Sequence, residues 1–264
     1  MDSSDVVLHN RATWDAYAEQ EIEWSTPVSA GEIARARAGD PQLVLTDHTP
    51  APRQWLPASL VGLDVLCLAS GGGQQAPLLA AAGARVVSFD NSPGQLAKDR
   101  LVAEREGLSL ETVLGDMRDL SVFPDASFDL VFHPVSNLFC PEVRPVWREV
   151  ARVLRVGGSL LAGFMNPAVY LFDPDDEDNG VITPRFRLPY ADVTQLEPER
   201  LQRWRSEGRA LEYSHSLQDQ IGGQADAGLA IVGLYEDRNP QRALDRHLPV
   251  YIATRSVKLP GLLT

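Results

Sequence analysis

The segment VLCLASGGG, residues 65–73, joins an uninterrupted apolar run to a cluster of glycines. A run of this kind is typical of a strand that is buried on both faces of a parallel sheet. The glycines permit positive φ and let the backbone approach a ligand closely. A helix is expected from Gln75, and the N–H groups of its first turn would point toward a ligand bound at these glycines. We therefore predict a strand, a glycine turn and a helix that form one side of a ligand site.

Around this segment, apolar strand patterns alternate with helical patterns that carry cap and stop residues. The predicted strands are residues 64–69, 85–89, 111–114, 128–133, 159–164, 229–236 and 250–256. The predicted helices between them are residues 75–82, 92–106, 144–154 and 216–227. Because such alternation implies parallel strands with helices on both faces, we predict an α/β fold with a doubly wound, mostly parallel seven-stranded sheet.

Two parts of the chain stand outside this alternation. Helical spacing at residues 10–24 and 29–38, followed by a proline-rich connection, predicts an N-terminal helical cap. After Phe164 the alternation stops, and we predict an insertion after the fifth strand that lies over the functional edge of the sheet. Within it are an acidic run (173–178), a possible hairpin (181–188) and an Arg/Glu-rich stretch (197–209). The predicted units are the cap (1–58), the core (59–165), the insertion (166–212) and the C-terminal part of the core sheet (213–264).

Composition limits the classes of function. The 264 residues carry a net charge of −12, which makes nucleic acid an unlikely partner because phosphate neutralisation supplies most of such affinity. The two cysteines, Cys67 and Cys140, form neither a disulfide framework nor a metal site, so we expect no metal and a reduced, cytoplasmic setting. The acidic start lacks a signal-peptide pattern, and no run of about 18 apolar residues predicts a membrane span.

Ligands of open parallel sheets bind beyond the carboxyl ends of the strands, where several loops of this chain should meet. Asp90 ends the second strand, and a carboxylate there can accept both ribose hydroxyls of a nucleotide cofactor. Asp116 and Met117 follow the third strand; they offer an acceptor for an adenine amine and an apolar side chain for the ring. Residues 133–137 follow the fourth strand and would face the reacting end of the cofactor.

Taken in order, VLCLASGGG, VVSFDNSP, LGDMRDL, FPDASFDLVF and EVARVLRVGGSLLAGF resemble the Rossmann-like (class I) S-adenosylmethionine (SAM)-dependent methyltransferases over roughly residues 60–165. The resemblance implies SAM as the cofactor and methyl transfer to an acceptor, which we expect to be a small molecule held between the N-terminal helices and the insertion. The implied cofactor-binding residues are Tyr17, Ala69, Ser70, Gly71, Gly73, Gln74, Gln75, Asp90, Asn91, Gly115, Asp116, Met117, His133, Pro134 and Val135. Among them the resemblance assigns the ribose to Asp90 and the adenine to Asp116 and Met117.

The chain departs from the family pattern in the first strand. Cys67 stands where the family usually has an acidic residue, and Ala69 replaces the first glycine of the turn. The amino group of the methionine moiety must then find another acceptor, for which the backbone carbonyls of Leu68 or Ala69, or the side chains of Gln74 and Gln75, are candidates. Cys67 itself is expected to be a small buried apolar residue.

Several alternatives remain open from the residues alone. The turn also satisfies a loose dinucleotide-binding pattern, so an NAD-dependent oxidoreductase is one rival, and a SAM-binding regulator without methyl transfer is another. His133 is the candidate catalytic base, although a histidine bonded to the backbone at a strand end is an equal interpretation. His215 could also face the substrate. Trp14, Trp24, Tyr170 and Phe172 could line the acceptor pocket or belong to the core.

Overall fold

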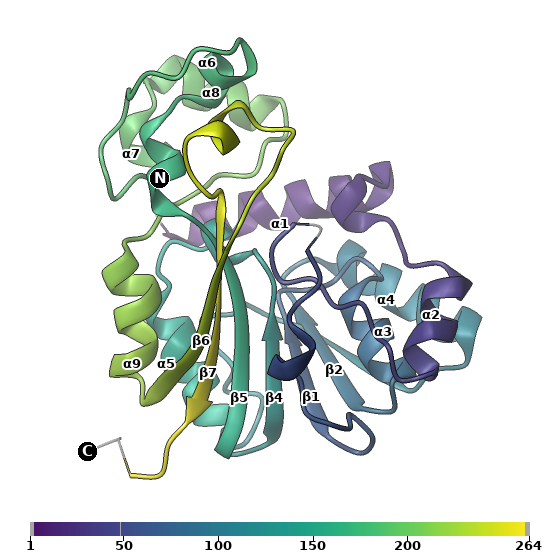
Figure 1. The fold of residues 1–264 in the computed structure, drawn as a ribbon. Coiled ribbons are helices and arrows are strands. Elements are labelled where there is room, and N and C mark those ends of the chain that lie inside the picture. Colours follow the sequence, from purple (N-terminus) through teal and green to yellow (C-terminus); the bar gives the residue numbers. More distant parts are fainter. Residues whose placement is uncertain (1–2, 48, 262–264) are drawn as a thin grey trace.

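A computed structural model of the protein describes residues 3–47 and 49–261. These residues form one twisted sheet with helices on both faces and a helical cap over one end (Figure 1). The strands are β1 (Asp64–Leu68), β2 (Arg85–Asp90), β3 (Leu110–Leu114), β4 (Phe128–His133), β5 (Leu154–Met165), β6 (Leu229–Asp237) and β7 (Tyr251–Lys258). The α-helices are α1 (Ser3–Gln20), α2 (Ala30–Arg37), α3 (Gln75–Ala81), α4 (Pro93–Glu106), α5 (Arg144–Val153), α6 (Pro174–Asp178), α7 (Asp192–Gln195), α8 (Pro198–Ser206) and α9 (Gly223–Asp226).

The strand order of the sheet is β3-β2-β1-β4-β5-β7-β6. Neighbours from β3 to β5 are parallel, whereas β7 runs antiparallel to both β5 and β6. The predicted doubly wound, mostly parallel seven-stranded sheet is therefore confirmed. Its order reverses between β1 and β4, which places a ligand site beyond the carboxyl ends of these two strands.

The apolar run in β1 fills both faces of the sheet. Val65 and Cys67 pack into a core that includes α2 and α3, and Leu66 and Leu68 pack into a second core that includes α5. All four side chains are fully buried, which explains why this strand shows no polar alternation. At about 25 cal/mol per Å² of apolar surface, each such side chain stabilises the fold by about 2 kcal/mol.

Local sequence signals set the helix starts. Ser29 and Glu32 form a reciprocal capping box at the start of α2. Ser92 caps α4 by accepting from the Gln95 N–H, and Pro93 occupies the first helical position. Gly107 ends α4 in the left-handed conformation that a helix stop requires.

Four predicted elements differ from the structure. The helix predicted at residues 10–24 is α1, which begins at Ser3 and ends at Gln20. β5 begins at Leu154, directly after α5. It continues through a register shift between the Phe128–Leu154 and Leu130–Ser159 pairs, where Gly157 takes a φ of 82°. Residues 181–188 form no hairpin, and their one bridge joins Pro184 to Phe172 instead. The single helix predicted at 216–227 is a π-helical turn, η5 (Gln218–Gly222), that leads into α9.

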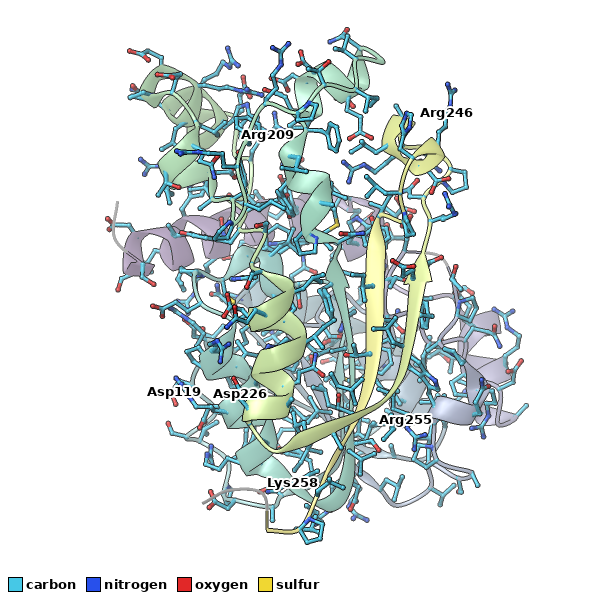
Figure 2. The ribbon with its side chains drawn as sticks, turned by 60° about the vertical axis from the view of Figure 1, so that its left-hand side comes forward. Asp119, Arg209, Asp226, Arg246, Arg255 and Lys258 are labelled. Atoms are coloured by element: carbon cyan, nitrogen blue, oxygen red, sulfur yellow. The ribbon has the colours of Figure 1, made fainter. Side chains whose placement is uncertain are left out.

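The insertion folds into the short helices α6, α7 and α8, above the carboxyl ends of the strands (Figure 1). The loop between β6 and β7 completes this cap, since Glu177 of α6 forms an ion pair with Arg242 at 2.6 Å and accepts the Leu244 N–H at 3.0 Å. No local sequence pattern indicates that this loop belongs to the cap. Figure 2 shows Arg209 and Arg246 at the cap end and Lys258 at the opposite end of the sheet.

In the described part of the chain, no helix has the length and apolarity needed to cross a membrane. The same residues contain no group of His, Cys, Asp and Glu side chains arranged to hold a metal ion. Cys67 and Cys140 are buried free thiols.

We predict that Gly163→Ala destabilises the protein by about 2–3 kcal/mol, because an added Cβ in β5 would overlap the Leu45 carbonyl oxygen. That carbonyl is held in place by the Val135 N–H at 3.0 Å, so it has little freedom to withdraw. Urea unfolding would measure the change. Gly31→Ala in α2 is the matched control, since its Cβ meets nothing closer than 3.8 Å and the helix favours alanine. Equal stability of the two variants would contradict the prediction.

Candidate active site

A cavity of about 1470 Å³ lies between the carboxyl ends of the strands and the cap. Loops after β1, β2, β3 and β4 form its floor, and α1 and the insertion form its walls. Most of the predicted cofactor residues line it: Tyr17, Ala69, Ser70, Gly71, Gln74, Gln75, Asp90, Asn91, Asp116, Met117, Pro134 and Val135. Gly73, Gly115 and His133 do not.

The glycine turn is shaped by the N-terminal segment. Gly72 has a φ of 107°, and a Cβ on it would lie 2.5 Å from the Trp24 carbonyl oxygen. Gly73 has a φ of 76°, and its Cβ would lie 3.0 Å from Pro27. These two glycines are therefore required for close packing of protein on protein, in addition to any approach of a ligand. Ala69 has a φ of 47°, a conformation that costs a side-chain residue about 1 kcal/mol.

A buried carboxylate that sequence analysis missed holds this turn. Asp99 of α4 is fully buried; it accepts the Gly73 N–H at 2.8 Å and the Ser88 hydroxyl at 2.6 Å. Burial raises the pKa of Asp99 to about 7. The sequence does contain a signal for the burial of Asp99. Its spacing from Leu96 and Val102 places it on the apolar face of α4.

Asp90 and Asp116 both line the cavity, and each has partners within the protein. Asp90 accepts the Gly71 N–H at 3.0 Å and the Ser92 N–H at 2.9 Å, and burial raises its pKa. Asp116 forms an ion pair with Arg118 at 2.7 Å, a partner that sequence analysis did not identify. Both carboxylates are thus fixed in direction before any ligand binds.

Helix α1 joins the cofactor side of the cavity to the cap. Asp15 accepts the Ser92 hydroxyl at 2.6 Å and the Gly94 N–H at 2.8 Å, which attaches α1 to the start of α4. Asn10 donates to the carbonyl oxygens of Phe139 and Leu211 at 3.0 and 2.9 Å. Its side-chain oxygen accepts the Leu211 N–H at 2.8 Å. One helix therefore holds the floor, the loop after β4 and the returning end of the insertion.

Two buried polar atoms at the cavity lack protein partners. Ser70 Oγ and Gln95 Oε1 have no hydrogen bond to any residue of 3–47 or 49–261. Their side chains belong to residues that line the cavity, and both residues are more than nine-tenths buried. Because an unsatisfied buried polar atom costs about 1–3 kcal/mol, this pair is suited to receive polar groups of a ligand.

The two candidate histidines lie away from the cavity. His133 is fully buried, its Nδ1–H donates to the Leu68 carbonyl at 2.8 Å, and burial lowers its pKa to about 4. His215 is also buried, with Nε2 3.0 Å from the Asn137 carbonyl, and burial lowers its pKa. The expectation of His133 as a base that meets the acceptor needs correction, since this ring belongs to the packed end of β4.

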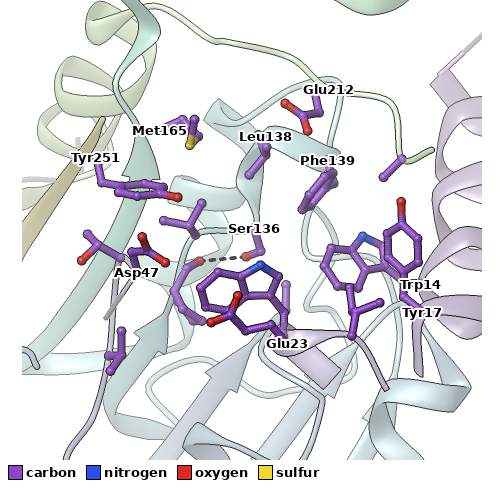
Figure 3. Close-up of a pocket in the computed structure, with 18 of the residues that line it drawn as sticks. Trp14, Tyr17, Glu23, Asp47, Ser136, Leu138, Phe139, Met165, Glu212 and Tyr251 are labelled. Atoms are coloured by element: carbon purple, nitrogen blue, oxygen red, sulfur yellow. Dashed lines mark hydrogen bonds between the residues drawn. The ribbon is translucent and has the colours of Figure 1, made fainter. Parts of the chain in front are cut away.

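Aromatic side chains form much of the upper wall (Figure 3). Trp14 packs edge-to-face against Tyr17 and Phe139, with ring centroids 5.4 and 5.1 Å apart. Tyr170 stacks on Tyr190 at 5.5 Å within the cap. Trp24 and Phe172 also line the cavity. The four aromatic residues for which sequence analysis left two roles open therefore all reach this cavity.

Known proteins share the sequence and the fold of this chain. A family described as "Methyltransferase domain" matches residues 66–162. An uncharacterized methyltransferase of Bacillus subtilis, YbaJ, is 47% identical over 254 residues, which cover 96% of this chain and 99% of that protein. The sterol 24-C-methyltransferase erg6 of Aspergillus fumigatus is 32% identical over 152 residues; the match covers 57% of this chain and only 38% of the relative.

Solved structures share the fold. A SAM-dependent methyltransferase from Mesorhizobium loti superposes with a TM-score of 0.60 at 20% identity, covering 78% of this chain and 94% of that one. A geranyl diphosphate methyltransferase, solved with sinefungin, gives 0.55 at 14% identity and covers 77% and 74%. At these identities the likeness concerns the fold.

We predict that Asp99→Asn reduces the dependence of stability on pH. The folded pKa of about 7 exceeds the ordinary value of 3.8, so folding binds a proton between pH 4 and 7, and the free energy of unfolding falls as pH rises through that range. Asparagine can still accept from Gly73 and donate to Ser88 Oγ, with no charge to bury. Unfolding at several pH values would show a fall between pH 5 and 7 that is smaller by about 2 kcal/mol in the variant. Parallel curves would show that Asp99 does not bind this proton.

Proposed function

The chain belongs to the SAM-dependent methyltransferases, and we propose that its acceptor is a small molecule enclosed beneath the cap. Membership of this family also decides between the two candidate cofactors, because these enzymes use SAM and not NAD. The observation that carries the proposal is the cavity of about 1470 Å³, which exceeds what one cofactor fills and extends from the glycine turn into the cap.

The walls of this cavity favour a compact acceptor over a macromolecule. α1, the insertion and the loop between β6 and β7 surround its upper part. The side chains there are largely aromatic, and carboxylates outnumber the arginines Arg209, Arg242 and Arg246. Such walls, on a chain with a net charge of −12, disfavour the phosphate backbone of a nucleic acid.

We infer that the floor of the cavity holds SAM. Asp90 would accept the ribose hydroxyls, and Asp116 with Met117 would hold the adenine. The partnerless Ser70 Oγ and Gln95 Oε1 fit the polar methionine end, in place of the acidic residue that Cys67 replaces. When bound, SAM supplies a methyl group that is bonded to a sulfonium sulfur. This sulfur is already a good leaving group for methyl transfer.

The protein then contributes alignment and exclusion of water. Asn10 and Asp15 hold α1 across the cavity, and Trp14 of α1 packs its apolar ring against Phe139 of the loop after β4. Ordering the donor and the acceptor in this way can supply several kcal/mol of the barrier reduction. This proposed role needs no histidine base at the positions of His133 or His215.

We predict that Asp90→Asn weakens binding of S-adenosylhomocysteine (SAH) by about tenfold to a hundredfold, the value of one charged hydrogen-bonding group. Isothermal titration would measure the dissociation constant. Asp226→Asn removes the same charge at an exposed position outside the cavity and should bind as the parent does. Unchanged affinity in Asp90→Asn would place the ribose elsewhere.

The acceptor class is tested by following the methyl group. The protein is incubated with methyl-labelled SAM and an extract of Bacillus subtilis, the organism of the relative, and the products are separated by ultrafiltration and acid precipitation. We expect enzyme-dependent label in the small, acid-soluble fraction. Label confined to precipitated protein or nucleic acid would overturn the small-molecule proposal.

A further inference from the structure

Glu212 is the carboxylate that the cap presents to the acceptor end of the cavity. It follows Leu211, where α1 holds the returning segment, and its N–H donates to Asp192 Oδ2 at 2.8 Å. Its side chain lines the cavity above Leu138 and Phe139 of the loop after β4 (Figure 3). This position faces the loop where the cofactor's reacting end is expected.

The side chain of Glu212 is held on one side and open on the other. Tyr170 donates its hydroxyl to Oε2 at 2.8 Å. Oε1 has no hydrogen bond to any residue in the described ranges 3–47 and 49–261. A ligand in the cavity can therefore reach this oxygen without displacing a protein group.

The charged groups around Glu212 leave its charge unbalanced. Burial and the neighbouring Asp192 carboxylate raise the pKa of Glu212 to about 7, against the lowering effect of Tyr170, Arg242 and Arg209. The two arginines are engaged elsewhere. Arg242 pairs with Glu177 at 2.6 Å, and Arg209 pairs with Asp175 at 3.6 Å and stacks on Trp204. Asp192 is itself hydrogen-bonded by the Tyr190 hydroxyl, which brings no positive charge.

Aromatic rings surround the same space. Tyr170 and Tyr190 stack beside the two carboxylates, and Phe139 and Trp14 form the facing wall. A carboxylate with an open oxygen, set among ring faces and without a cation of its own, is the environment that binds an ammonium group.

We propose that Glu212, positioned by Tyr170, binds the amino group of the methyl acceptor and thereby selects a small amine. This inference rests on the proposed function, because it concerns the acceptor end of the same cavity. Glu212 acts here as a specificity-determining residue, and the cofactor site on the floor does not depend on it.

The test compares three ligands that share the same phenol ring and differ in charge: tyramine (a cation), tyrosol (neutral) and phloretate (an anion). Each is titrated into the full-length protein saturated with SAH. We expect tyramine to bind at least about tenfold more tightly than either of the others. Equal affinities, preference for phloretate or no detectable binding of tyramine would each overturn the inference.

Two variants separate recognition from folding. Glu212→Gln can still accept the Tyr170 hydroxyl, and we expect it to lose the preference for tyramine while its SAH affinity stays unchanged. Glu199→Gln removes the same charge at an exposed position of α8 outside the cavity, and should keep the preference. A preference that survives in Glu212→Gln would overturn the inference.

The pH dependence gives a readout that a purely structural role would not produce. As pH falls below about 7, Glu212 takes up a proton and tyramine affinity should fall in the parent protein, whereas in Glu212→Gln this decline should be absent. The same pH dependence in both proteins would count against the inference. A parent protein that failed to bind SAH would instead contradict the cofactor site of the proposed function.

Discussion

The buried carboxylate of Asp99 is the constraint on which the cofactor side of this protein depends. It joins the Gly73 N–H of the turn after β1 to the Ser88 hydroxyl of β2, and α4 supplies it. Residues of this turn have left-handed backbone conformations, so their N–H groups belong to no helix or sheet. These N–H groups therefore need an acceptor from elsewhere in the protein. With Asp99 in place, Gly71 donates to Asp90, and two neighbouring strand ends become parts of one rigid floor.

The N-terminal segment then adds a wall to this floor. Its backbone near Trp24 lies against Gly72, and Gln95 binds Ser25 at 2.6 Å. α1 continues across the cavity and binds the insertion through Asn10. Elements that are far apart in the sequence thus share one cavity, with polar groups on its floor and aromatic rings and carboxylates in its cap.

Sequence reasoning recovered the parts of this arrangement that local pattern encodes. The apolar run of β1, the Ser92 cap and the Asp90 carboxylate all follow from short-range signals, and these parts lie where they were expected. The missed parts depend on distant contacts. Nothing near Glu212 reveals that Tyr170 will bind it, and nothing near His133 reveals that the Leu68 carbonyl will hold it inside the sheet. Likewise, the loop between β6 and β7 joins the cap through Glu177 and through Leu244, which packs in one apolar cluster with Tyr170, and these cap residues lie far from the loop in sequence.

The hydrogen bonds by which Asn10 attaches α1 bear on how such a protein can diversify. All its hydrogen bonds go to main-chain atoms, namely the carbonyl oxygens of Phe139 and Leu211 and the Leu211 N–H. Because the amide contacts no side chain in these bonds, the residues on either side of the cavity can be exchanged during evolution while the attachment of α1 is preserved. The cap can thus acquire new acceptor preferences while α1 keeps its place across the cavity.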